Sequence, residues 1–288
     1  MVALGGGHGL AATLQAARRY AGDVTAIVSV ADDGGSSGRL RAAFGIPAPG
    51  DVRRCLVALA DPASPWTEAF EYRFEAGGLE GHAFGNLVIT GLAEVTGDFE
   101  CAIAEAGRVL GATGRVIPAT REPVVLKAEV RTPGSNGEVS VEGQMNVAQA
   151  EGVSAVSLIP ADAEPPPAAL EALAAADQVV IGPGSLYTSV LAVVAVPAIR
   201  AALAATPART VYVCNLHQQA PETTGYDVAA HVDALTAHGV GVDVVLCHRD
   251  ALPKGALTVP CVERALARTD GLGHDPARLA IALMNLLG

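Results

Sequence analysis

Short apolar runs of strand length recur along the chain, and several of them end in polar, glycine-rich segments. The run at residues 24–30 consists of Val, Ile, Ala, Thr and one Ser, which is typical of a strand buried on both faces of a parallel sheet. Further strands are predicted at residues 2–4, 177–181, 210–214 and 243–247, and the segments between them have apolar residues at helical spacing. Half of the residues are apolar and only 4% are aromatic. We therefore predict an α/β fold in which helices pack on a parallel sheet.

One part of the chain departs from this alternation. Short strands are predicted at residues 116–118, 124–130 and 138–141. The Pro-Gly-Ser-Asn-Gly run at 133–137 predicts a turn between the last two of them. We interpret residues of about 115–143 as a small antiparallel excursion within one α/β domain that spans residues 1–288. The run at 153–159 then returns to the strand pattern.

The segment after the 24–30 strand is a candidate site. It is rich in carboxylates, glycines and hydroxyls, and it lies at the carboxyl end of a strand, where open α/β sheets bind ligands. Asp32 and Asp33 can bind ribose hydroxyls or a divalent cation such as Mg²⁺, which makes them the candidate catalytic and metal-binding residues. The candidate anion-binding residues, which offer close backbone approach and donor groups, are Gly34, Gly35, Ser36 and Ser37. A solvent-exposed turn is the alternative.

A glycine loop follows the first predicted strand and leads into a helix predicted from Leu10. Unpaired N–H groups and the positive end of the helix dipole then coincide, which makes a phosphate site. The candidate residues are Gly6, Gly7, His8, Gly9 and Leu10. His8 either donates to an anion or lies exposed in the loop. Residues 7–12 also match the loose pattern G-x-G-x-x-A, with Asp32 about twenty residues further on, so a NAD-binding oxidoreductase is one alternative.

The same order of strand, loop and helix recurs at residues 177–189. Its candidate residues are Gly182, Pro183, Gly184, Ser185, Leu186, Tyr187 and Thr188. Asn215 follows the strand at 210–214, so we expect it at the same edge of the sheet. Two such loops on one sheet can face one crevice and hold the two ends of a ligand such as a nucleoside diphosphate.

Two further helix starts carry polar candidates. His82 and Asn86 are four residues apart and can share one helix face; they would either polarise an oxygen in the distal half of the ligand or cap the helix. Asp51 is predicted to cap a helix that begins at residue 52. Arg53 and Arg54 lie near that start, where cations oppose the helix dipole unless an anion is close. Two solvated arginines are the alternative.

Charge and composition exclude some classes of function. The net charge of −11 and the lack of a basic run argue against nucleic-acid binding. No apolar run reaches membrane-spanning length, so we expect no membrane insertion. Five cysteines without a Cys-x-x-Cys pair predict reduced core thiols in a cytoplasmic protein. His231, His238 and His248 lack metal-like spacing, and we interpret them as surface or capping residues.

Six motifs occur in an order and spacing that resemble one bacterial family. They are GGGHGL at 5–10, ADDGGSSGRLR at 31–41, PGDVR at 49–53, GHAFGNL at 81–87, IGPGSLYTS at 181–189 and CN at 214–215. Over nearly the whole chain they resemble the gluconeogenesis factor family (YvcK), which is related to 2-phospho-L-lactate transferase (CofD).

The resemblance implies a Rossmann-like, mostly parallel sheet with helices on both faces, in a cytoplasmic protein needed for cell shape and cell-wall growth on gluconeogenic carbon. It implies a nucleotide-sugar ligand, a UDP-sugar such as UDP-N-acetylglucosamine, with cell-wall synthesis proteins as partners. The transferase relatives use magnesium to move phospholactate from a guanylyl carrier, so a CofD-type, magnesium-dependent transferase is the enzymatic alternative. Whether the chain acts as a homodimer is left open.

Some positions depart from the family pattern. His8 replaces a usual Thr, and Arg54 replaces a usual Asn. The family's arginine before its final His-Asp or His-Asn pair, implicated in UDP-sugar binding, corresponds to Gly273, ahead of His274 and Asp275. The segment at 253–269 is also shortened. Loss of that cation would remove a charge-assisted contact to a diphosphate.

Overall fold

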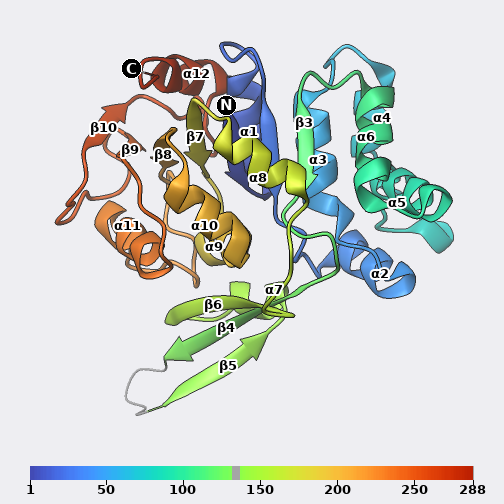
Figure 1. Ribbon diagram of the computed structural model, residues 1–288, viewed down its shortest axis with the longest axis horizontal. Helices are drawn as coiled ribbons and strands as arrows, with labels where there is room; N and C mark the ends of the chain where they lie inside the picture. Colours follow the sequence, from blue (N-terminus) through green and yellow to red (C-terminus); the bar gives the residue numbers. More distant parts are fainter. Residues whose placement is uncertain (132–136, 288) are drawn as a thin grey trace.

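A seven-stranded sheet forms the centre of the computed structural model, which describes residues 1–131 and 137–287 (Figure 1). The strand order is β10-β9-β8-β7-β1-β2-β3, and all neighbouring strands are parallel. The predicted α/β fold is therefore confirmed. The strands are β1 (Val2–Gly5), β2 (Thr25–Val28), β3 (Arg115–Pro118), β7 (Gln178–Ile181), β8 (Arg209–Val213), β9 (Val244–His248) and β10 (Cys261–Arg264).

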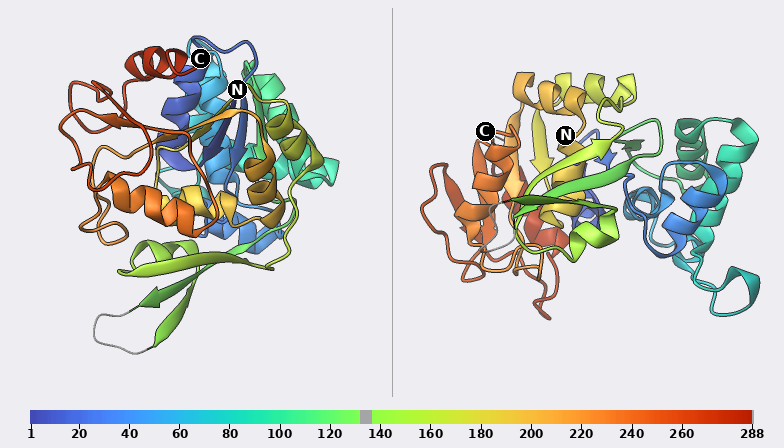
Figure 2. Two further views of the ribbon diagram at one scale, coloured as in Figure 1. Left: turned by 60° about the vertical axis from the view of Figure 1, so that its left-hand side comes forward. Right: turned by 90° about the horizontal axis from the view of Figure 1, so that it is seen from below.

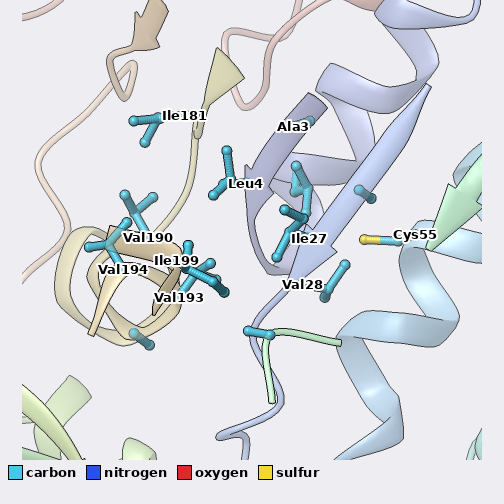
Figure 3. Close-up of a cluster of buried hydrophobic side chains, with 14 of the residues drawn as sticks. Ala3, Leu4, Ile27, Val28, Cys55, Ile181, Val190, Val193, Val194 and Ile199 are labelled. Atoms are coloured by element: carbon cyan, nitrogen blue, oxygen red, sulfur yellow. The ribbon is translucent and has the colours of Figure 1, made fainter. Parts of the chain in front are cut away.

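Successive residues of the central strands face opposite layers of helices. In β7, Val180 belongs to one apolar cluster and Ile181 to the other. In β8, Val211 joins the cluster of Val180, and Tyr212 joins that of Ile181. Figure 3 shows part of the second cluster, which extends from the helices that follow β7 past β1 and β2 to Cys55. Because both faces of the sheet are buried at its centre, the central strands are apolar at successive positions rather than at alternate ones.

Helices cover both faces of the sheet. On one face of β7–β9, α1 (Gly7–Ala17) packs beside α12 (Pro276–Met284). The other face carries η2 (Leu186–Val190), α9 (Leu191–Val194) and α10 (Pro197–Ala205). The remaining helices are α2 (Gly35–Phe44), α3 (Pro49–Leu59), α4 (Pro65–Glu71), η1 (Gly77–Leu79), α5 (Phe84–Thr96), α6 (Phe99–Leu110), α8 (Pro167–Ala174) and α11 (Val228–Ala237).

Within the described part of the chain, no single helix has both the length and the apolar character needed to cross a membrane. One pair of segments, Leu186–Val194 and Pro197–Ala205, meets these requirements only jointly, across a bend of 77°. All residues of the first segment are buried in the fold.

A three-stranded antiparallel sheet projects from the main body (Figures 1 and 2). Its order is β5 (Glu138–Glu142), β4 (Val125–Arg131), β6 (Val153–Ile159), and α7 (Gln144–Ala148) connects β5 to β6. The excursion predicted at about 115–143 is therefore misplaced at both ends. β3 pairs in parallel with β2, and β6 belongs to the small sheet. In β6, residues 155, 157 and 159 are exposed in alternation, as in a sheet with one solvated face.

Three local predictions differ from the structure, and a fourth lies outside it. A further strand, β10, follows the strand that was predicted to be the last. The glycine loop is shorter than predicted, because α1 already begins at Gly7. Ala48 rather than Asp51 is the N-cap residue of α3, since Pro49 already occupies the first turn, where its missing N–H costs nothing. The turn predicted at 133–137 falls, apart from Gly137, outside the described residues.

The predicted exposure of two side chains is also wrong. His231 is fully buried, and its Nδ1 pairs with the carbonyl oxygen of Asp227. It lies on the apolar face of α11, between Val228 and Leu235, which is the face that packs on the core. Cys101 is exposed rather than a core thiol.

The strand order reverses between β1 and β7. α1 follows β1 on one face of the sheet, and η2 follows β7 on the other, an arrangement that opens a crevice at the strand tips. The two loops nevertheless touch at the sheet edge. A Cβ added at Gly9 would lie 2.6 Å from the Pro183 carbonyl carbon and closer still to its oxygen. The Thr13 hydroxyl also donates to the Gly182 carbonyl oxygen, at 2.8 Å.

We expect Gly9→Ala to destabilise the protein by about 1–3 kcal/mol, the usual cost of overpacking a tight contact. The added methyl group would force the two loops apart, although alanine by itself favours a helix by about 1 kcal/mol. Urea denaturation followed by circular dichroism measures the change. Gly22→Ala is the control, because nothing lies within 4 Å of a Cβ there. Equal stability of the two variants would contradict the need for this contact.

Candidate functional site

Two adjoining hollows lie at the carboxyl ends of the central strands. The larger has a volume of about 720 Å³, and its lining mixes polar side chains with the apolar ones of Ala11, Val57, Leu216 and Leu272. We call it the apolar hollow to distinguish it from its neighbour. The smaller has a volume of about 450 Å³, and we call it the polar hollow. Its charged and hydroxyl-bearing lining residues are Asp32, Ser36, Ser37, Asp51, Arg53, Arg54, Arg73, Ser185 and Ser189.

The two hollows form one crevice, because they share part of their lining. The shared residues are His8, Gly9, Arg54, Gly184 and Gln219. They come from the first turn of α1, from α3, and from the loops after β7 and β8. The first and second glycine loops therefore converge on one place, as predicted.

Two helix starts aim backbone donors at the crevice. The amides of His8 and Gly9 in α1 have no hydrogen-bond acceptor among the described residues. The same holds for the amides of Gly35–Ser37 in α2, within that same part of the chain. N-terminal amides and the helix dipole favour an anion at such points. Both starts line the polar hollow, so both can act on an anion bound there.

Asp51 and Arg54 form an ion pair under the first loop. Arg54 Nη1 lies 2.7 Å from Asp51 Oδ1, and the Gly7 amide also donates to the Asp51 carboxylate. Burial raises the pKa of Asp51, Arg54 opposes the rise, and the charge of Asp32 adds to it. Asp51 thus fixes Arg54 where both hollows meet, so Arg54 is a positioned cation and not merely a solvated one.

A hydrogen-bonded chain runs from Arg53 to His82. Buried Arg53 pairs with Glu71 and donates from Nε to Asn86 Oδ1 at 3.1 Å. Asn86 Nδ2 donates to Ser36 Oγ at 3.1 Å, and the Ala83 amide donates to the same oxygen at 3.4 Å. With both acceptor positions of Ser36 Oγ filled, its proton is left for His82 Nδ1, 3.1 Å away.

His82 is therefore a neutral acceptor in this chain. Burial lowers the pKa of His82, and the charges of Arg39 and Arg73 lower it further, in agreement with an unprotonated Nδ1. His82 itself does not line either hollow, whereas Asn86 lines the polar one. His82 and Asn86, which the sequence predicted to share a helix face, are thus connected through the Ser36 hydroxyl and do not act only as helix caps.

Asn215 holds the second loop by a two-bond clamp. The Gly184 amide donates to Asn215 Oδ1 at 3.0 Å, and Asn215 Nδ2 donates to the Gly184 carbonyl oxygen at 2.9 Å. Asn215 Nδ2 also reaches Gln219 Oε1 at 3.1 Å. Gln219 is thereby fixed at the junction of the two hollows.

An internal carboxylate occupies the helix start after the second loop. Glu222 Oε1 accepts from the amides of Tyr187, at 2.6 Å, and Thr188, at 3.0 Å. Burial raises the pKa of Glu222, and these two N–H groups oppose the rise. The donors that we expected to hold phosphate are therefore already used within the protein, and Leu186, Tyr187 and Thr188 are buried away from the crevice.

Asp32 and Asp33 point to different places. Asp32 lines the polar hollow, and its Oδ1 accepts from the Gly34 amide at 3.0 Å. No donor among residues 1–131 and 137–287 reaches its Oδ2. Asp33 lines neither hollow; its Oδ1 accepts from the Met145 amide at 2.9 Å. Asp33 therefore ties α7 to the main body, and Asp32 is the carboxylate that a ligand can reach.

The structure brings most of the predicted site residues to the crevice. Those that line it are Gly6, Gly7, His8, Gly9, Asp32, Gly34, Gly35, Ser36, Ser37, Asn86, Pro183, Gly184, Ser185 and Asn215. Those that do not are Leu10, Asp33, His82, Gly182, Leu186, Tyr187 and Thr188.

Sequence reasoning missed lining residues from several further segments, among them Glu71 in α4 and Arg73 just after it. Gln144 and Met145 reach the polar hollow from α7, and no local motif marks them. Arg268 and His274 reach the apolar hollow, where the departure from the family pattern at Gly273 could have drawn attention to them. A Cβ at Gly273 would lie 3.9 Å from Arg268 Nε, so another guanidinium lies beside the position of the absent arginine.

The family model described as 2-phospho-L-lactate transferase CofD matches residues 1–271. The chain belongs to this family. A crystal structure of a member of the UPF0052 family from Bacillus halodurans superposes with a TM-score of 0.92 and 37% identity, covering 98% of this chain and 97% of that one.

Relatives at high identity place the chain among the gluconeogenesis factors of this family. The gluconeogenesis factor of Halalkalibacterium halodurans is 44% identical over 256 residues, 88% of this chain and 78% of the relative. That of Bacillus subtilis is 42% identical over 253 residues, 86% of this chain and 78% of the relative. A relative from Nostoc sp. is 46% identical over 254 residues, but the chain spans only 55% of its length.

We expect Ser36→Ala to destabilise this family member by about 1–3 kcal/mol, because Asn86 Nδ2, the Ala83 amide and His82 Nδ1 all lose their common partner. Ser37→Ala is the matched control, since Ser37 is equally buried, at 4% exposure, but its hydroxyl has no partner in the described part of the chain. Chemical denaturation measures both. A similar loss in both variants would mean that the chain of hydrogen bonds contributes nothing specific.

We expect stability to fall as the pH drops from about 6.5 to about 4, in part through His274. Burial, helped by His248, lowers the pKa of His274 from 6.5 to about 4. Between these pH values the unfolded chain binds a proton at His274 that the folded chain does not bind. His274 therefore leaves the free energy of unfolding unchanged above pH 6.5 and lowers it by up to about 3 kcal/mol near pH 4. Urea denaturation of the wild type and of His274→Phe at pH 7 and pH 4.5 checks this. An unchanged pH dependence in the variant would contradict it.

Proposed function

We propose that this chain binds a nucleotide sugar across the two hollows, with its diphosphate over the first turn of α1. The observation that carries the proposal is the convergence of the free amides of two helix starts with Arg54 at the junction of the hollows. A diphosphate is recognised by several N–H donors together with a guanidinium. The family description, a transferase of a phosphorylated compound, agrees with an anionic small molecule.

The linings of the two hollows suggest the orientation of the ligand. The apolar hollow offers Ala11, Val57 and Leu216 to the faces of a base. The polar hollow offers the hydroxyls of Ser37 and Ser189, which suit the hydroxyl groups of a sugar. We therefore place the nucleoside in the apolar hollow and the sugar in the polar one.

Mg²⁺ fits the polar hollow together with ligand phosphates. Residues 1–131 and 137–287 contain no group of three or more His, Cys, Asp or Glu side chains that could hold a metal alone. Asp51 is engaged by Arg54, but Asp32 Oδ2 is free, and Mg²⁺ is commonly bound by one or two carboxylates plus substrate phosphates. Asp32 would hold the ion, which when bound offsets phosphate charge.

A role in gluconeogenic growth follows from the relatives, which are named gluconeogenesis factors. Within that role we propose UDP-N-acetylglucosamine or a similar UDP-sugar as the ligand, and a report of its level to cell-wall synthesis proteins that control cell shape. We also propose that residues 1–288 act as one nucleotide-binding domain, since α7 of the small sheet lines the polar hollow. A CofD-type transfer of phospholactate is the second candidate, favoured by the family description and by Asp32.

We expect UDP-N-acetylglucosamine to raise the melting temperature of the protein, more strongly with Mg²⁺ than without. At a ligand concentration one hundred times the dissociation constant, the stabilisation is about 2.7 kcal/mol. Asp32→Asn keeps the acceptor for the Gly34 amide and removes the charge, so it should abolish the Mg²⁺-dependent part. Asp33→Asn is the matched control and should bind like the wild type. Thermal unfolding followed by dye fluorescence measures all three proteins.

GDP and NAD are the comparison ligands in the same experiment. Stabilisation by NAD alone would overturn the proposal in favour of an oxidoreductase. Stabilisation by GDP, together with product formation from a guanylyl-phospholactate donor, would favour the transferase. Equal weakening by Asp32→Asn and Asp33→Asn would contradict the assignment of the ligand-facing carboxylate to Asp32.

A further inference from the structure

Two cysteines on neighbouring strands touch each other at one edge of the main sheet. Cys247 lies in β9 and Cys261 begins β10, and their Sγ atoms are 3.0 Å apart. Both are free thiols, and no other two cysteines in the described part of the chain are hydrogen-bonded to each other. A disulfide joins its sulfurs at about 2.05 Å. The two thiols therefore lie within about 1 Å of bonding distance.

The pairing register shows what closing this gap requires. Cys261 is opposite Val245 and Cys247 is opposite Glu263, so the two cysteines share a face of the sheet but are offset by two residues. Strand spacing and rise place Cα atoms with such an offset about 8 Å apart, whereas a disulfide joins Cα atoms at most about 7 Å apart. Bond formation therefore draws β10 along β9. Since β10 is an edge strand and pairs in the main sheet with β9 alone, no second neighbour in that sheet holds it back.

The two thiols differ in how easily they react. Cys247 is 5% exposed, and burial together with its hydrogen bond to Cys261 raises the pKa of Cys247. Cys261 is half-buried and therefore within reach of solvent. Lys254 lies beside the pair: Glu263, its ion-pair partner, raises the pKa of Lys254 most, and the charges of Cys261 and Cys247 raise it further. Because this attraction is mutual, the Lys254 ammonium favours the thiolate of the accessible Cys261.

The chain that follows β10 leads directly to the apolar hollow. His248, the last residue of β9, accepts at Nδ1 from the amides of Leu266, at 2.8 Å, and Ala267, at 3.4 Å. Arg268 and Asp270, which come next, line the hollow. A shift of β10 along β9 acts on these two hydrogen bonds, because their acceptor lies in β9 and their donors follow β10.

We propose that Cys247 and Cys261 are a redox-sensitive pair, whose disulfide displaces β10 and with it the segment that carries Arg268 and Asp270 to the apolar hollow. The oxidant is a low-molecular-weight disulfide such as oxidised glutathione. The inference goes beyond the proposed function, since neither the disulfide nor the displacement needs a bound ligand.

The oxidation proceeds by two thiol–disulfide exchanges. The Cys261 thiolate attacks a sulfur of oxidised glutathione, so that the glutathione disulfide breaks, a mixed disulfide forms and one glutathione leaves as its thiol. Cys247 then gives up its proton and attacks the Cys261 sulfur, which releases the second glutathione. Two protein thiols are oxidised, one glutathione disulfide is reduced to two thiols, and the two protons of the protein thiols end on glutathione.

Incubation of the full chain with reduced and oxidised glutathione at pH 7, followed by alkylation of the remaining thiols and peptide mass spectrometry, tests whether the disulfide forms. We expect Cys247 and Cys261 to escape alkylation and to appear as one disulfide-linked pair of peptides. Cys101, which is exposed and has no cysteine partner in the described part of the chain, is the internal control and should at most form a mixed disulfide with glutathione. In Cys247→Ser, Cys261 should stop at the mixed disulfide; if this variant does not fold, the wild-type peptides still decide.

Hydrogen exchange followed by mass spectrometry compares the oxidised with the reduced wild-type protein and tests the displacement. We expect peptides that contain Leu266 and Ala267 to exchange severalfold faster after oxidation, because the shift weakens the hydrogen bonds of these amides to His248. Peptides from α5, which lies at the opposite end of the molecule from β10 (Figure 1), should exchange equally in both states.

Two results would overturn the inference. One is that Cys261 of the wild type stays a thiol or stops at the mixed disulfide, since Cys247 would then be out of reach. The other is a disulfide that leaves exchange at Leu266 and Ala267 unchanged, since the bond would then not act on the segment beside the hollow. Neither result bears on the proposed function, which binding of UDP-N-acetylglucosamine to the reduced protein tests separately.

Discussion

The backbone contact between Gly9 and Pro183 is the constraint on which the crevice depends. The loops after β1 and β7 lead to opposite faces of the sheet, and without this contact they would border two separate surfaces. Thr13 and Asn215 hold the second loop in place through Gly182 and Gly184. Any side chain larger than hydrogen at position 9 would separate them. The switch point of the sheet thus becomes one continuous crevice rather than two unrelated loops.

Internal carboxylates decide which helix starts remain available to a ligand. Glu222 lies at the start of η2, so the Tyr187 and Thr188 amides bind the protein's own anion. Asp51 takes only the Gly7 amide of α1 and is itself paired with Arg54. The net result at α1 is favourable to an external anion, because the next amides have no acceptor in the part of the chain that the structure describes and the carboxylate charge is compensated by a guanidinium.

The sequence patterns predicted the parallel sheet and the convergence of the two loops, because both follow from local periodicity and from topology rules. They did not separate Asp32 from Asp33, since adjacent residues in a loop differ only in direction, and that direction depends on α7 from a distant segment. They also missed Glu222, which no motif links to the second loop. β3 was assigned to the wrong sheet because a four-residue strand has no periodicity that reveals its partner. The seven-residue β6 was misassigned because apolar residues, Ala155 and Ile159, occupy two of its exposed positions and hide the alternation.

Gly273, where the family resemblance implies an arginine, need not leave the apolar hollow without a positive charge. The Arg268 guanidinium lies about 4 Å from the position that a Cβ at residue 273 would take, and its Nε donates to the His274 carbonyl oxygen. A longer side chain at 273 would compete with Arg268 for this space. A glycine here therefore fits a site in which the cation comes from position 268. The charge in the apolar hollow depends on where the guanidinium group lies in the folded protein. A comparison of sequences one position at a time does not reveal that location.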